Sequence, residues 1–249
     1  MDTPFLIFLF FITALIYSLV GFGGGSTYLA LLILFHFPFE TIPKIALVCN
    51  IVVVLGGVIQ FAKGGHLKIK KILPFVLLSI PFSYLGGAMV IDKTLFLILL
   101  GLSLAAAGLR LLFFHDAKRC GTILQRKGEA AIGFLTGGVL GFLSGLVGIG
   151  GGIFLAPLLY FLKWGNPKEI AAASSFFIFV NSISGLLGQF SKKGEGLDFL
   201  TLIPFVLAVF LGGQIGSRLG AEKISFLKLQ QLTASLILYV SFRIFWGLL

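Results

Sequence analysis

Acidic residues are scarce in this chain and absent from the interior of its apolar stretches. The 249 residues include only nine Asp and Glu, and all nine lie in or beside the connections between hydrophobic segments. Proteins that carry cations or protons across a membrane usually hold Asp, Glu or His inside the bilayer, because a buried charge is tolerated there only for function. The pattern argues against cation transport.

Cysteine and histidine are too few and too scattered to predict a metal centre or a catalytic group. The two cysteines, Cys49 and Cys120, show no CxxC spacing, and the three histidines all lie at the ends of segments. No Gly-x-Ser-x-Gly motif of a hydrolase is found either. We therefore expect no enzymatic activity, no cofactor, no metal and no disulfide.

Apolar residues make up 58% of the chain and charged residues 11%, which predicts an all-α integral membrane protein. The first apolar segment lacks the basic region and the cleavage site of a signal peptide, so a retained helix is expected. The formal charge of +10 lies in short connections without interleaved aromatic residues. The predicted environment is the lipid bilayer, and nucleic acid is not a predicted partner.

Glycine, proline and charged residues divide the apolar sequence into ten predicted helical segments, five in each half. They run over 4–20, 26–37, 43–61, 72–91, 94–114, 130–147, 153–162, 168–190, 199–216 and 224–249. The second and seventh have 12 and 10 residues, fewer than the ~20 that cross a bilayer. Whether these two cross fully or are re-entrant stays open.

Lysine and arginine predict the orientation. If the segments alternate, 14 of the 19 basic residues lie on one side and five on the other. The positive-inside rule places the richer side in the cytoplasm, with both termini facing outward. An odd number of segments per half makes the second half enter from the opposite side, which is an inverted repeat. The predicted units are 1–114 (first repeat), 115–129 (cytoplasmic linker) and 130–249 (second repeat).

Short matches between the halves support duplication. Pro43-Lys44 matches Pro167-Lys168, Gln60-Phe61 matches Gln189-Phe190, Pro74-Phe75-Val76 matches Pro204-Phe205-Val206, and Leu85-Gly86-Gly87 matches Leu211-Gly212-Gly213. Arg110 also matches Arg243, and all of these matches keep the same order, with offsets between 124 and 133 residues.

Two glycine clusters of nearly the same form interrupt the apolar sequence at matching places. Gly-Phe-Gly-Gly-Gly covers Gly21 to Gly25, and Gly-Ile-Gly-Gly-Gly covers Gly148 to Gly152. Such clusters predict broken helices, because glycine spoils helix propensity and allows close backbone approach. The free N–H groups and the dipole at a helix start favour an oxyanion. The two clusters therefore predict an anion site near the middle of the bilayer.

Neutral polar residues near the glycines complete the predicted site without a buried charge. The predicted substrate-binding residues are Gly23, Gly24, Gly25, Ser26, Thr27, Asn50, Gly150, Gly151, Gly152, Ser174, Ser175 and Asn181. Ser26 and Thr27 add hydroxyls to the first cluster, whereas the second supplies mainly backbone and depends on Ser174 and Ser175. The alternative for each serine is close helix packing, where Gly, Ser and Thr are also common.

The duplicated GxGGG cluster, the Ala-Pro-Leu-Leu at 156–159 and the Ala-Ala-Ser-Ser at 172–175 make the chain resemble the TauE/SafE (TSUP) sulfite-exporter family over nearly its whole length. One departure is Ala30, which stands in the first half where the second has Pro157. The resemblance implies a multi-pass inner-membrane carrier of small sulfur-containing anions such as sulfite, thiosulfate or organosulfonates.

Three functions remain open from the sequence. The leading one is secondary transport by alternating access around a midplane site. The second is an anion channel lined by the same glycine breaks. The third is a membrane scaffold that recruits a partner through the basic linker at 115–129. Lipid-facing helices rich in phenylalanine would permit a homodimer.

Overall fold

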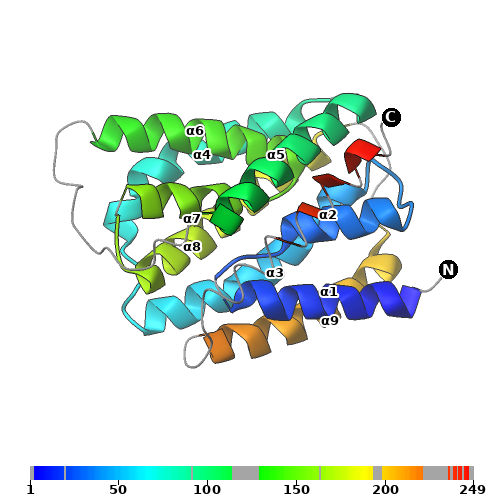
Figure 1. The fold of residues 1–249 in the computed structure, drawn as a ribbon, viewed down its shortest axis with the longest axis horizontal. Coiled ribbons are helices and arrows are strands. Elements are labelled where there is room, and N and C mark those ends of the chain that lie inside the picture. Colours follow the sequence, from blue (N-terminus) through cyan, green and yellow to red (C-terminus); the bar gives the residue numbers. More distant parts are fainter. Residues whose placement is uncertain are drawn as a thin grey trace.

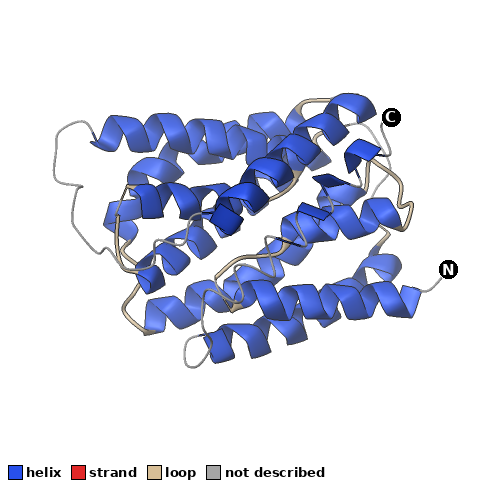
Figure 2. Cartoon of the chain, viewed as in Figure 1, coloured by secondary structure: helices blue, strands red, loops and turns tan. Residues whose placement is uncertain are grey.

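The computed structural model describes residues 3–19, 21–90, 92–113, 129–162, 164–192 and 198–220, with eight further residues between 235 and 246. Within these ranges all regular structure is helical, as Figure 2 shows. The helices are α1 (Thr3–Ser18), α2 (Gly25–Leu34), α3 (Ile42–Lys63), α4 (Ile69–Ala88), α5 (Lys93–Phe113), α6 (Glu129–Val147), α7 (Gly152–Phe161), α8 (Pro167–Phe190) and α9 (Phe199–Gly220). The all-α prediction is confirmed.

These nine helices match the first nine predicted segments to within a few residues at each end. Four of them have a stretch long and apolar enough to cross a membrane: Ile42–Lys63, Ile69–Ala88, Lys168–Phe190 and Leu200–Leu219. Most of the tenth predicted segment, 224–249, and nearly all of the linker, 115–129, lie outside the described residues.

Local sequence explains where two of the helices, α8 and α2, begin. Helix α8 starts with a capping box, in which the Asn166 Oδ1 accepts from the Glu169 N–H at 2.9 Å and the Glu169 Oε2 accepts from the Asn166 N–H at 3.2 Å. Helix α2 instead follows Gly24, whose φ of 89° is a left-handed conformation that favours glycine. The two types of start suit a surface loop and a buried break respectively.

Helices α1 and α2 form an antiparallel hairpin around the first glycine cluster. The Tyr17 and Thr27 hydroxyls lie near the break, the rings of Phe10 and Tyr28 stack at 4.6 Å, and Phe5 meets Phe35 at the open end of the hairpin. In Figure 1, α1 runs leftward from the N mark and α2 turns back toward that end. The first short segment therefore turns back toward the end of the molecule at which α1 begins.

The second half repeats this arrangement from the other end of the molecule. In Figure 1, α6 starts at the end opposite the N mark and α7 turns back toward its start. Helices α2 and α7 each have 10 residues, a length of about 15 Å, or half of a bilayer core of about 30 Å. With its far end at a membrane surface, each short helix would begin near the middle of the bilayer, at its glycine break. This supports the inverted repeat, which stays a prediction.

Helices of each half also pack against helices of the other half. Helix α4 packs on α6, and α9 packs on α1, while α3 and α8 cross between them. The repeated glycines allow these helices to pack closely. A Cβ on Gly86 of α4 would lie 2.2 Å from the Phe142 carbonyl oxygen of α6, and a Cβ on Gly212 of α9 would lie 2.4 Å from the Phe11 carbonyl oxygen of α1. The matched motifs make the same close approach in each half.

Candidate anion site at two broken helices

The first break lies between Ser18, where α1 ends, and Gly25, where α2 begins. The Thr27 and Tyr28 N–H groups donate to the Gly24 carbonyl at 3.0 Å each. Among the described residues, no backbone acceptor receives the N–H groups of positions 23–26. The start of α2 therefore presents free donors and the positive end of the helix dipole.

The second break has the same construction. Gly148, Gly150 and Gly151 have φ values of 82°, 83° and 77°, which favour glycine. The N–H groups of Phe154 and Leu155 donate to the Gly151 carbonyl. Those of positions 149–153 find no backbone acceptor in the described part of the chain. Each short helix thus begins with unpaired donors inside the protein.

Asn50 of α3 connects the two breaks. Its Nδ2 donates to the Ile149 carbonyl of the second break at 3.0 Å. A Cβ on Gly23 would lie 2.3 Å from the Asn50 Oδ1, and one on Gly25 would lie 2.4 Å from the Nδ2. A Cβ on Gly150 would lie 3.0 Å from the same nitrogen. Only glycine fits around this side chain, and its Oδ1 has no hydrogen-bond partner.

Helix α8 contributes the other predicted side chains, all of them buried. The Ser175 Oγ donates to the Gly21 carbonyl of the first break at 2.7 Å. This bond links a helix of the second half to the break in the first half. The Ser174 Oγ has no partner. Asn181 donates from its Nδ2 to the Phe177 carbonyl of its own helix at 2.8 Å, and its Oδ1 is unpaired.

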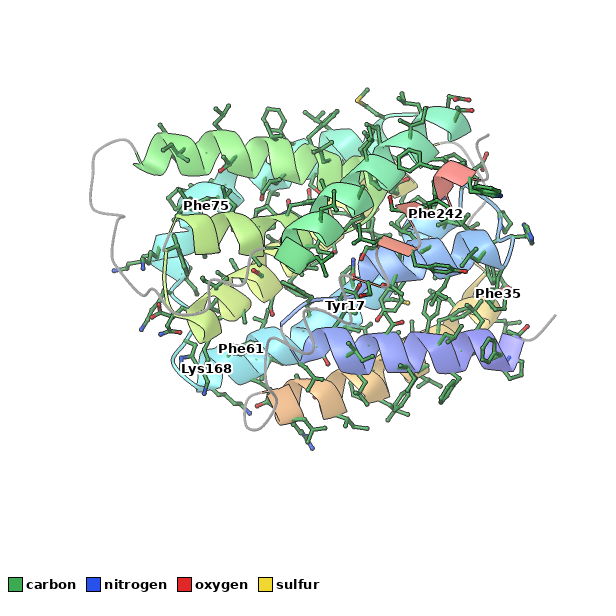
Figure 3. The ribbon with its side chains drawn as sticks, viewed as in Figure 1. Tyr17, Phe35, Phe61, Phe75, Lys168 and Phe242 are labelled. Atoms are coloured by element: carbon green, nitrogen blue, oxygen red, sulfur yellow. The ribbon has the colours of Figure 1, made fainter. Side chains whose placement is uncertain are left out.

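The predicted Thr27 hydroxyl of the first break pairs with Tyr17, a residue that sequence reasoning missed. The Tyr17 and Thr27 hydroxyls lie 2.7 Å apart, and Ser26 is buried beside Thr27 at the start of α2. Figure 3 places Tyr17 near the centre of the molecule, between Lys168 and Phe61 at one end and Phe35 at the other. Tyr17 and Thr27 are ten positions apart, and only the hairpin brings them together.

Three more buried hydroxyls near the breaks lack a hydrogen-bond partner: those of Tyr28, Ser144 and Ser182. A Cβ on Gly24 would lie 3.0 Å from the Tyr28 hydroxyl oxygen, and one on Gly150 would lie 2.9 Å from the Ser182 Oγ. Ser144 and Ser182 are ordinary small residues in the sequence. Their places become clear only once α6 and α8 are packed.

All twelve predicted site residues are buried, and the side chains among them are uncharged. Charged groups lie toward the ends of the helices: the Lys71 Nζ lies 4.7 Å from the Trp164 ring centre, and the Lys44 Nζ lies 5.9 Å from that of Phe190. Burial and the nearby Lys44 lower the pKa of Lys192, just beyond α8. In the described residues no cluster of His, Cys, Asp or Glu could hold a metal ion. The site can offer an anion neutral donors, with cations toward the ends of the molecule.

Comparison with known proteins gives a consistent result. Residues 6–244 match the family model described as sulfite exporter TauE/SafE. A protein of Sinorhizobium fredii named "Probable membrane transporter protein" is 31% identical over 95% of this chain and 96% of its own length. One of the same description from Methanocaldococcus jannaschii is 32% identical over 88% of this chain and 85% of its own.

A third such protein, from Bacillus subtilis, is 27% identical over 89% of this chain and 90% of its own length. No solved structure matches. The family match over almost the whole chain, with relatives of about equal length, is consistent with the helical fold and its apolar spans. The chain belongs to the sulfite exporter TauE/SafE family of membrane transporters.

Proposed function

We propose that the protein is a secondary transporter that exports small sulfur-containing anions such as sulfite, thiosulfate or organosulfonates. The observation that carries the proposal is the meeting of the two glycine breaks at Asn50. Unpaired N–H groups at two helix starts converge there in a buried, uncharged setting, which suits an oxyanion. The family description names sulfite.

The proposed mechanism is alternating access. Each hairpin, α1–α2 and α6–α7, packs on helices of the opposite half, because α9 lies against α1 and α4 lies against α6. A rocking motion of these groups about Asn50 would open the site to one side and close it to the other. The ligand would stay at the middle while the path to each side changes.

An anion channel is the alternative, since the same breaks could line a pore. The burial of all twelve predicted site residues favours a carrier, because a conducting pore keeps its lining residues in contact with water. Single-channel currents from the purified protein in a planar bilayer would favour the channel. Accelerated uptake of labelled sulfite when unlabelled sulfite is present on the other side would favour the carrier.

The test of the transport proposal uses purified protein in proteoliposomes loaded with labelled sulfite. We expect saturable efflux that unlabelled sulfite, thiosulfate or an organosulfonate inhibits. Empty liposomes and liposomes that hold an unrelated membrane protein are the controls. If efflux is no faster than in these controls for any sulfur oxyanion, the proposal is wrong.

A further inference from the structure

The start of α7 differs from that of α2 in the side chains that surround it. In the first break, the Thr27 hydroxyl is bonded to Tyr17 at 2.7 Å, and the unpaired hydroxyl is that of Tyr28, on α2 itself. In the second break, two serine hydroxyls from two other helices have no partner: Ser144 of α6 and Ser182 of α8. Both residues are 0% exposed.

Both hydroxyls lie against the left-handed glycines that precede α7. The Ser182 Oγ is 2.9 Å from the position that a Cβ on Gly150 would take, and the Ser144 Oγ is 3.3 Å from the corresponding position on Gly151. The two glycines have φ values of 83° and 77°. The hydroxyls therefore lie beside the backbone segment whose N–H groups are unpaired.

A buried hydroxyl without a partner is unusual, because leaving such a group unpaired costs free energy. Serines in membrane helices commonly donate to a backbone carbonyl, as Ser79 does to Val76 at 3.0 Å and Ser184 does to Ile80 at 2.6 Å. Ser144 and Ser182 make no such bond. Two unpaired hydroxyls therefore lie beside a helix start whose N–H groups are also unpaired. This combination indicates a binding site for a ligand that accepts hydrogen bonds.

From this arrangement we propose that Ser144 and Ser182 bind the oxygen atoms of the transported anion at the start of α7. The inference rests on the proposed transport function and assigns the oxyanion group to the second break. The ligand is a small oxyanion with at least two free oxygens, such as a sulfite or sulfonate group. The α7 N–H groups and the two hydroxyls donate to those oxygens.

The experiment measures the KM and the maximal rate of sulfite efflux in proteoliposomes for Ser144→Ala, Ser182→Ala and the wild-type protein. Ser79→Ala is the matched control, since Ser79 is equally buried but already bonded within its own helix. Removing a donor to a charged ligand is expected to raise KM roughly tenfold. The control is expected to stay within about twofold on the same scale.

Ser144→Cys and Ser182→Cys form a second pair of variants, because the thiol fills the space of the hydroxyl but is a weak donor. They are expected to show the same rise in KM. An unchanged KM in folded Ser144 and Ser182 variants, with wild-type protein active, would overturn this inference alone. Wild-type protein that transports no sulfur oxyanion would overturn the proposed function and, with it, this assignment.

Discussion

Asn50 holds the two glycine breaks together, and the Ile149 carbonyl to which it donates lies 99 positions further along the chain. Its amide group fills the space beside the glycines, which have no side chains. Its Nδ2 donates to the Ile149 carbonyl, which lies in the break between α6 and α7. A side chain without that donor would leave the carbonyl unpaired, at a cost of about 1–3 kcal/mol. The geometry of both helix starts therefore depends on this residue.

We predict that Asn50→Leu abolishes sulfite transport while the protein still inserts into the membrane. Leucine has the same branched arrangement of side-chain heavy atoms but cannot donate to Ile149. Efflux from proteoliposomes measures the effect, and Ile59→Leu on the exposed side of α3 is the control. Transport at the wild-type rate in Asn50→Leu would contradict the role given to Asn50.

Gly150 offers a matched comparison with Gly65, since both have a positive φ, of 83° and 72°. An alanine at either position has a conformational cost of about 1 kcal/mol. At Gly150 the new methyl group also lies within 3.0 Å of Ile178, Ser182 and Asn50, whereas at Gly65 nothing lies within 4 Å.

We therefore expect Gly150→Ala to lose transport and Gly65→Ala to keep most of it. Efflux rates, normalised to the amount of folded protein, give the comparison. Equal activity of the two variants would argue against a site at the breaks. If altering the linker at 115–129 then abolished activity, the scaffold alternative would gain support.

At the scale of elements, the short helices α2 and α7 could be read directly from the sequence. Both begin at a glycine cluster and end after 10 residues. The other helices were predicted to within a few residues at each end, because glycine, proline and charged residues bound their apolar runs. The site was only partly predictable. Asn50 stood out as an amide in an apolar segment, but Tyr17, Ser144 and Ser182 gain their meaning from helices that pack across the two halves.

The close contact between α4 and α6 gives a prediction about stability. A Cβ on Gly86 would lie 2.2 Å from the Phe142 carbonyl oxygen, so alanine there forces the helices apart. We expect Gly86→Ala to lower the free energy of unfolding by about 1–3 kcal/mol. Gly212→Ala is expected to act similarly where α9 meets α1, with its Cβ 2.4 Å from Phe11.

Gly138→Ala is the control for this contact, because it lies on α6 with its nearest neighbour, Phe82, at 3.7 Å. It is expected to leave stability unchanged or slightly raised, since alanine favours the helix. Thermal unfolding of the detergent-solubilised proteins measures all three. A smaller loss in Gly86→Ala than in Gly138→Ala would refute the packing argument.

At the scale of the whole molecule, the charge count and the hairpins agree. The first hairpin returns to the side where α1 begins, so the connection before α3 lies on the same side whether α2 crosses or turns back. The predicted split of 14 and five basic residues is therefore the same whether the two short helices cross the membrane or turn back within it. The orientation itself stays a prediction.

Single-cysteine labelling in intact cells tests that orientation. Glu40 lies just before α3 and Ala62 near its end, and both are exposed. In a background without Cys49 and Cys120, we expect Glu40→Cys to react with a membrane-impermeant thiol reagent from outside. Ala62→Cys should react only after the cells are permeabilised. The reverse result would invert the topology.

The packing of helices between the halves also has a consequence during synthesis. Helix α1 packs on α9, which begins roughly 180 residues after α1 ends. At a translation rate of about 5–20 residues per second, the first helix waits about 10–40 s for its partner. Throughout that interval, the surface of α1 that will pack on α9 is in contact with lipid or with the insertion machinery. The nascent chain therefore depends on its membrane surroundings for longer than a chain whose helices pack in order.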